Sequence, residues 1–151
     1  MKYTILRPSL VYGPGVKGNL KKLYDAIQTG WLPPLPIFSN RKSMLHVDDL
    51  IRALHFVKMN PKAFNEIFIL TDGVPYSTGE IYSILRKVIG KKYFNLKFLS
   101  FMVKIILQVP FVSKKMKKLL NSDFYSSEKI SLIGFKTKYK LKDINYSQFI
   151  T

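Results

Sequence analysis

Residues 4–15, which read TILRPSLVYGPG, constrain the fold of this chain more than any other stretch. Apolar residues within 2–7 predict a β-strand. The prolines and glycines of residues 8–18 predict a loop directly after it, because proline fixes the chain path and glycine accepts positive φ. Ligands of open α/β sheets bind beyond the carboxyl ends of the strands. The stretch therefore predicts an α/β fold with a binding region at this loop.

Helices are expected to alternate with short strands in the rest of the chain. Asn19 is expected to cap a helix at 20–29, and Ser77 and Glu80 form the capping box of another helix. The other predicted elements are strands at 37–38, 43–46 and 66–70, a helix capped by Asp48 or Asp49 that ends before Pro61, and a helix at 127–133. We expect the opening strand to lack the neighbours that would complete its sheet.

Residues 93–120 hold a dense apolar run followed by paired lysines. The run is too short, and Lys104 too central, for a helix that crosses a membrane. We interpret it as a buried helix followed by a basic, solvent-facing one. The less favoured alternative is an interfacial helix that contacts a membrane through residues 98–118.

The chain is strongly basic, with 25 lysines and arginines, 9 acidic residues and a net charge of +16. This charge fits either a solvated lysine-rich surface or binding to nucleic acid, acidic membranes or phosphorylated ligands. We prefer the solvated surface, since arginine, which grips phosphate through two donors, is scarce. The absence of cysteine excludes disulfides, and no signal peptide is visible, so a cytoplasmic location is expected.

Motifs for a complete active site are sparse. Residues 13–18 spell G-x-G-x-x-G, but Pro14 and Lys17 favour an extended loop over a tight phosphate-binding turn. We expect the chain to lack a G-x-x-G-x-x-G loop, a G-x-S-x-G elbow and a catalytic Tyr-x-x-x-Lys pair. With only two histidines and few acids, a metal site is not expected either.

Several residues instead suit a nucleoside diphosphate. Asn19 begins a predicted helix, and the N-terminus of a helix attracts phosphate. Arg41 and Lys42 could neutralise the phosphates, and the predicted strand at 37–38 offers an apolar edge to a base. Each feature alone also fits a helix cap, a surface turn or core residues, and their order along one chain favours the joint interpretation.

Four stretches, at residues 5–15, 41–50, 68–73 and 132–135, resemble the C-terminal half of extended short-chain dehydrogenases/reductases, the NAD-dependent nucleotide-sugar epimerases and dehydratases. Residues 16–19 and 40–43 look most like bacterial UDP-N-acetylhexosamine 4-epimerases and 4-keto-reductases of surface-polysaccharide synthesis. The resemblance implies the last part of a doubly wound Rossmann-type sheet plus a small substrate-binding subdomain, without the N-terminal cofactor half. Residues 1–18 would be the late strand and loop, and residues 19–151 the substrate-binding region of a single partial domain.

The resemblance also implies site residues. Those implied for substrate binding are Ser9, Leu10, Asn19, Leu20, Pro36, Ile37, Phe38, Arg41 and Lys42, and those implied for cofactor binding are Pro8, Ser9 and Val11. Lys42 stands where the family usually has a phosphate-binding arginine, and Arg41 could substitute for it. His46 would be structural, and no residue of the chain is expected to be catalytic.

The implied function is the UDP-sugar-binding portion of an NAD(P)-dependent sugar 4-epimerase or 4-keto-reductase, inactive by itself. NAD or NADP would serve the complete enzyme, and this chain alone would hold neither tightly. The expected partners are a UDP-sugar and either the missing N-terminal half or a second copy, with no specific nucleic acid. The alternatives are a basic module that binds nucleic acid or acidic membrane, and an inert truncated product.

Overall fold

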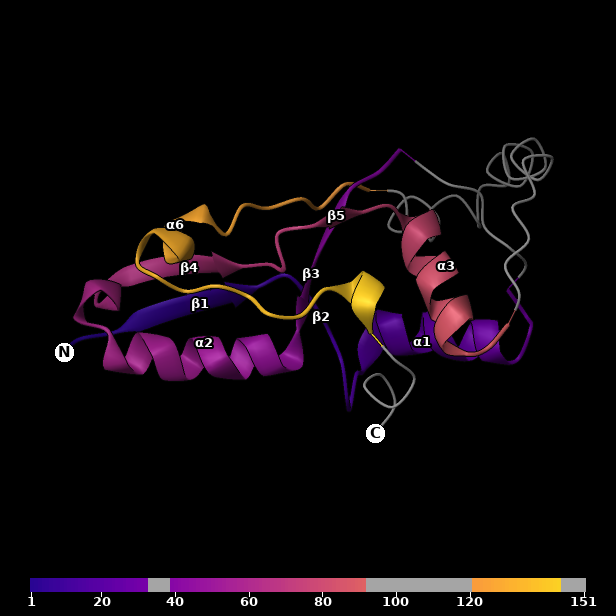
Figure 1. Ribbon diagram of the computed structural model, residues 1–151, viewed down its shortest axis with the longest axis horizontal. Helices are drawn as coiled ribbons and strands as arrows, with labels where there is room; N and C mark the ends of the chain where they lie inside the picture. Colours follow the sequence, from indigo (N-terminus) through magenta and orange to yellow (C-terminus); the bar gives the residue numbers. More distant parts are fainter. Residues whose placement is uncertain (33–38, 92–120, 145–151) are drawn as a thin grey trace. The chain divides into compact units, whose positions relative to one another are not determined.

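The computed structural model describes residues 1–32, 39–91 and 121–144. Its elements, drawn in Figure 1, are β1 (Thr4–Pro8), β2 (Leu10–Tyr12), α1 (Gly18–Gln28), β3 (Lys42–His46), α2 (Val47–Met59), η1 (Pro61–Ala63), β4 (Glu66–Leu70), β5 (Pro75–Tyr76), α3 (Thr78–Val88), α6 (Glu128–Leu132) and η2 (Leu141–Asp143). The chain divides into two compact units. Unit 1 comprises 1–16, 43–75 and 124–151, and unit 2 comprises 17–42 and 76–123.

Parallel strand pairs form the centre of unit 1. β1 pairs with β4 from Thr4 opposite Glu66 to Pro8 opposite Leu70, and β2 pairs with β3 over three residues. α2 connects β3 to β4, so the order alternates strand and helix as expected. These pairings confirm the α/β class and the strands predicted at 2–7, 43–46 and 66–70. β2 lies within the predicted loop at 8–18, so that part of the prediction was wrong.

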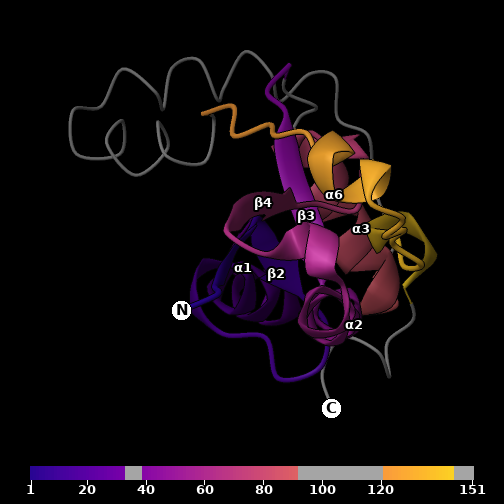
Figure 2. The same cartoon turned by 90° about the vertical axis from the view of Figure 1, so that its left-hand side faces the viewer.

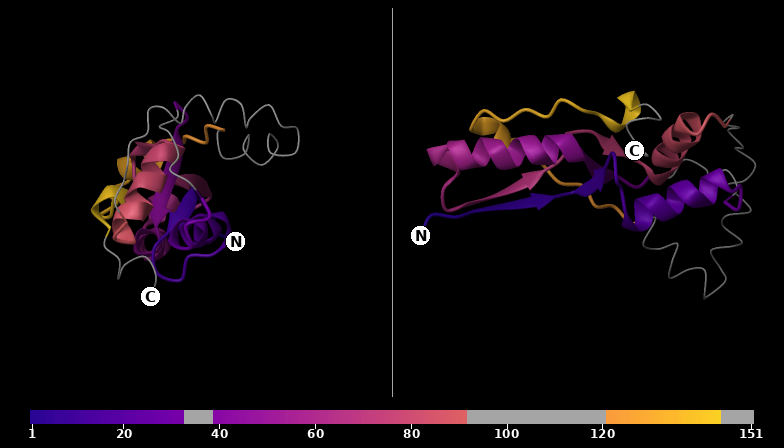
Figure 3. Two further views of the ribbon diagram at one scale, coloured as in Figure 1. Left: turned by 90° about the vertical axis from the view of Figure 1, so that its right-hand side faces the viewer. Right: turned by 90° about the horizontal axis from the view of Figure 1, so that it is seen from below.

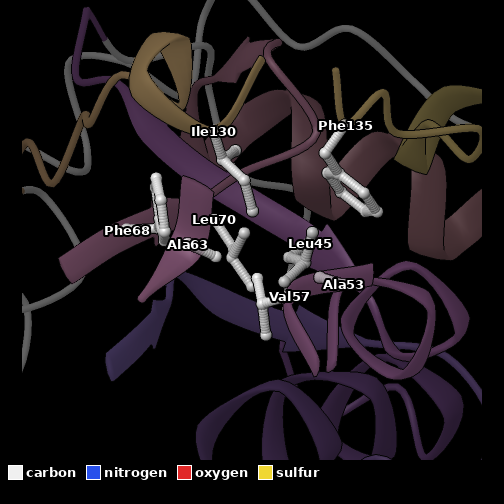
Figure 4. Close-up of a cluster of buried hydrophobic side chains, with 8 residues drawn as sticks. All are labelled: Leu45, Ala53, Val57, Ala63, Phe68, Leu70, Ile130 and Phe135. Atoms are coloured by element: carbon white, nitrogen blue, oxygen red, sulfur yellow. The ribbon is translucent and has the colours of Figure 1, made fainter. Parts of the chain in front are cut away.

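One apolar cluster holds the helices of unit 1 against the sheet (Figure 4). Its buried members come from β3, α2, η1, β4, α6 and the residues after α6: Leu45, Ala53, Val57, Ala63, Phe68, Leu70, Ile130 and Phe135. Phe68 and Leu70 lie two residues apart and therefore on the same face of β4. α2 and α6 consequently cover that one face. Figure 1 and the right-hand view of Figure 3 show α2 running along the β1–β4 pair, and Figure 2 looks along the axis of α2.

The boundaries of α2 depend on local capping. His46 is the N-cap, and its Nδ1 accepts a hydrogen bond of 3.2 Å from the backbone N–H of Asp48. The predicted cap at Asp48 or Asp49 was therefore wrong, because both residues lie in the first turn and the imidazole supplies the acceptor. The helix ends at Met59 before Pro61, as predicted.

Unit 2 is built on α1 and α3, whose apolar faces pack together. The capping box of Ser77 and Glu80 starts α3 as predicted. The prediction that Asn19 caps α1 was wrong, because the helix begins at Gly18 and its N-cap is Lys17, which makes no side-chain cap bond. Lys91 Nζ donates to the terminal carbonyls of α1 at Ile27 (2.9 Å) and Gln28 (2.7 Å).

Some predictions lie outside the described residues. These are the strand at 37–38 with the site residues Pro36, Ile37 and Phe38, and the segment at 98–118 proposed for membrane contact. Among the residues that the structure describes, no helix has the length and apolar character needed to span a membrane.

Candidate functional site

The residues predicted around the cofactor lie together in unit 1, where β1 ends. Pro8 is the last residue of β1, Ser9 follows it, and Leu10 and Val11 belong to β2. The Ser9 N–H donates to the Leu70 carbonyl at 3.0 Å, which places Ser9 at the carboxyl end of the parallel β1–β4 pair. Ser9 Oγ is buried and has no hydrogen-bond partner among the described residues. A buried hydroxyl of this kind is suited to a bound ligand at the strand ends.

The described residues predicted around the diphosphate belong to unit 2. Asn19 is exposed in the first turn of α1, whereas Leu20 is only 2% exposed, so its side chain contributes to the core. Arg41 is exposed, and its backbone N–H donates to Ser122 Oγ at 3.1 Å. Arg41 is therefore more accessible to a phosphate than Lys42, whose side chain is only 13% exposed.

Lys42 has a competing partner that sequence reasoning missed. Its Nζ lies 3.2 Å from the Asp123 carboxylate, and its side chain is only 13% exposed. A β-bridge joins the same two residues. Because Asp123 neutralises Lys42, the predicted phosphate contact would require this ion pair to rearrange.

Asn40 is a second polar residue that the sequence did not single out. The residue is 7% exposed, and its side chain donates to Thr78 Oγ1 at 2.8 Å and accepts from the Thr78 N–H at 3.1 Å. These bonds hold the residues before β3 against the start of α3, within unit 2. They span 38 residues of sequence, so no local pattern could have indicated them.

His46, at the carboxyl end of β3, is buried between aromatic rings. Its ring stacks on Tyr139 at 4.4 Å and meets the edge of Tyr12 at 5.2 Å. Burial lowers its pKa, an effect that Asp48 and Asp49 oppose. Gly13 passes so close that a Cβ there would lie 2.8 Å from Val47 Cγ1, and its φ is +123°. These contacts fit the structural role expected of His46.

The expectation that the chain lacks a Tyr-x-x-x-Lys spelling was wrong. It occurs at Tyr93–Lys97, outside the described residues, and at Tyr125–Lys129. Lys129 Nζ pairs with the Glu66 carboxylate at 2.6 Å. Tyr125 precedes α6, so the two residues are not one turn apart on a helix. The described pair thus lacks the helical spacing that would place both groups at one reaction centre.

Among residues 1–32, 39–91 and 121–144, no group of three or more histidine or acidic side chains lies close enough together to hold a metal ion.

Comparison with known proteins agrees with this arrangement. Residues 1–70 match the NAD dependent epimerase/dehydratase family. A curated relative, UDP-glucose 4-epimerase of Vibrio cholerae, is 34% identical over 99 residues, which are 64% of this chain and 30% of the relative. The chain thus spans about a third of the length of this relative.

Solved structures show the same fold. UDP-glucose 4-epimerase of Thermotoga maritima, crystallised with UDP-glucose, has a TM-score of 0.63 at 21% identity, and the match covers 97% of this chain and 44% of that one. The Bordetella bronchiseptica enzyme WbmG, in complex with NAD and UDP, has a TM-score of 0.56 at 16% identity, covering 91% and 39%. The comparison confirms the Rossmann-like α/β fold. Over residues 1–70, the chain is similar to the NAD-dependent epimerase/dehydratase family.

Proposed function

We propose that this chain is the nucleotide-sugar-binding portion of an NAD(P)-dependent sugar 4-epimerase or 4-keto-reductase. The observation that carries the proposal is the position of residues 8–11, which lie at the carboxyl end of the β1–β4 pair and inside the segment that matches the family. Pro8, Ser9 and Val11 would then face the cofactor. A UDP-N-acetylhexosamine is the proposed substrate, for surface-polysaccharide synthesis.

The proposed diphosphate contacts are Asn19 and Arg41, with Leu20 contributing through its backbone. Arg41 is favoured over Lys42, because Arg41 is exposed whereas the Lys42 side chain is only 13% exposed. Arginine also offers the paired donors that match a phosphate, which a single ammonium does not. A lysine at position 42, where the family usually has an arginine, is therefore compatible with phosphate binding by Arg41.

The face of the β1–β4 pair opposite α2 and α6 is exposed, which supports the proposal that this chain is a portion of a larger domain. Ile5 and Ile67 lie opposite each other in the register and are 41% and 40% exposed. Parallel sheets occur almost only with both faces covered. Further α/β structure that binds the cofactor would cover this face, whether it lies on the same polypeptide or another. Without it we expect no catalysis.

Calorimetric titration of the chain with UDP, UDP-glucose and UDP-N-acetylglucosamine tests the proposal. Loss of charged hydrogen bonds should weaken binding by roughly 10-fold or more in an Arg41→Ala/Lys42→Ala variant. A Lys58→Ala/Lys62→Ala variant removes the same charge from exposed positions of unit 1 and should bind like the parent.

Equal, weak binding by both variants would contradict the assigned diphosphate contacts. If all binding instead disappears steeply as salt is raised, the basic-module alternative is supported, because only polyanion binding depends on counterion release at many lysines.

A further inference from the structure

Arg41 is exposed, but its backbone is fixed on both sides of its Cα. Its N–H donates to Ser122 Oγ at 3.1 Å, and its carbonyl accepts the N–H of Asp123 at 2.8 Å. The following residue, Lys42, forms a β-bridge with Asp123. The main chain at Arg41 is therefore held along residues 122–123, and all of these residues belong to unit 2.

Asn40, the residue before Arg41, has a buried side chain that is bonded through both of its polar atoms. Its Oδ1 accepts the Thr78 N–H at 3.1 Å, and its Nδ2 donates to Thr78 Oγ1 at 2.8 Å and to the Asn121 carbonyl at 3.4 Å. Thr78 is the first residue of α3 and is itself 3% exposed. Two bonds to one buried residue fix both the position and the rotation of the amide group, because releasing it would leave buried polar atoms unpaired.

These contacts matter for a ligand because an exposed arginine has a long and freely rotating side chain. A ligand that binds such a side chain has to order it, and the cost of ordering is subtracted from the affinity. The planar guanidinium also binds phosphate well only when its paired donors face the oxygens. A backbone that is already fixed at Arg41 lowers this cost, since the side chain then starts from one point and one direction.

We infer that Asn40 is a positioning residue of the diphosphate site, which anchors the backbone of Arg41 to the start of α3. The inference rests on the proposed function, in which Arg41 contacts the diphosphate. Asn40 acts through Arg41 and does not touch the ligand itself, because its amide group is bonded to Thr78 and Asn121.

The competing interpretation is that Asn40 only stabilises unit 2. The two interpretations differ in whether the effect of Asn40 on binding passes through Arg41. A double-mutant cycle separates them, because two residues that act as a unit are not additive whereas independent residues are.

The test is a calorimetric titration of the full chain with UDP, carried out on the parent, Asn40→Ala, Arg41→Ala and the double variant. Asn40→Ala should weaken binding by roughly 3- to 10-fold in the parent, and by less than about twofold when Arg41 is already alanine. An equal loss in both backgrounds, or no loss in the parent, would overturn the inference and leave the proposed function intact. If Arg41→Ala itself binds UDP like the parent, the diphosphate contact of the proposed function fails, and the inference fails with it.

Ser77→Ala is the matched control, because it removes the hydroxyl that caps α3 through the Glu80 N–H and keeps the bonds between Asn40 and Thr78. It should lower the temperature of unfolding and leave the affinity for UDP unchanged. A loss of affinity as large as that of Asn40→Ala would overturn the inference, since any damage to the start of α3 would then suffice. If Asn40→Ala does not fold, Thr78→Val and Thr78→Ser take its place. The valine variant, which lacks the Oγ1 acceptor, should bind UDP about threefold or more weakly than the serine variant, and equal binding by the two would overturn the inference.

Discussion

Asp49 connects α2 to the segment after α6 through a carboxylate with no exposed surface. Its oxygens accept the backbone N–H groups of Lys138 and Tyr139 at 3.0–3.1 Å, and Arg52 completes the set. A buried carboxylate is tolerated only when its lone pairs are occupied in this way. This contact holds residues 138–139 against the first turn of α2.

Asp49→Asn should therefore lower the free energy of unfolding by roughly 2–4 kcal/mol, because an amide group cannot accept all of these donors. Asp48→Asn removes the same charge from a side chain that is 49% exposed and should change it by less than about 0.5 kcal/mol. Urea unfolding at pH 7.5 measures both. Equal effects of the two substitutions would show that charge in the first turn matters, and the buried contacts do not.

His46 should make stability depend on pH. Burial lowers its folded-state pKa below the usual 6.5, so the unfolded chain binds more protons as the pH falls below that value. The free energy of unfolding should then decrease between about pH 7 and pH 5. Protonation would also remove the Nδ1 acceptor that caps α2.

His46→Asn keeps a capping acceptor and removes the titration. Urea unfolding at pH 7.5 and 5.5 should thus show a smaller loss of stability in this variant than in the parent. An identical loss would assign the pH dependence to other groups.

Among the elements, α1 is the helix whose start is least stabilised by its own sequence. Lys17 occupies the N-cap with φ −124° and ψ −179°, and it offers no acceptor to the first backbone N–H groups. α3 has a complete capping box at the corresponding place. The contrast indicates a stabilising substitution.

Lys17→Asp should raise the free energy of unfolding by about 1 kcal/mol, because it supplies both a cap acceptor and a negative charge at the positive end of the helix. Lys17→Ala, which removes the lysine without adding an acceptor, should have little effect. Thermal unfolding followed by circular dichroism compares the two variants. A gain in the alanine variant as large as that in the aspartate variant would contradict the capping explanation.

Local signals made α3 and β4 predictable, since the capping box of Ser77 and Glu80 and the apolar run at 66–70 need no distant partner. β2 could not be predicted, because Leu10–Tyr12 is flanked by Pro8 and Gly13 and becomes a strand only by pairing with β3. The same limit applies to the candidate site. The resemblance indicated Ser9 and Arg41, whereas the pairing of Lys42 with Asp123 spans 81 residues and left no sequence signal.

In the whole molecule, one face of the β1–β4 pair exposes apolar side chains to solvent. An edge strand with exposed isoleucines is prone to associate with other chains. Ile5 lies on β1 and Ile67 on β4, in register, and both are about 40% exposed. The face should behave as an interface rather than as ordinary surface.

Ile5→Thr/Ile67→Thr should reduce self-association of the purified chain, measured by sedimentation velocity, while its stability changes by about 1 kcal/mol or less, because threonine keeps the strand preference. Ile51→Gln/Leu54→Gln removes two exposed apolar side chains of α2 and serves as the control. If both variants reduce association equally, then general surface hydrophobicity explains it, and the sheet face has no special role.

We propose that this chain binds a nucleotide sugar, with contacts from the residues after β1 in unit 1 and from Asn19 and Arg41 in unit 2. A titration with UDP-glucose in 0.3 M salt, followed by amide NMR shifts, tests it most directly. We expect saturable shifts at Ser9, Leu10, Asn19 and Arg41. Shifts confined to the lysines of residues 136–142, or no saturable shift at all, would contradict it.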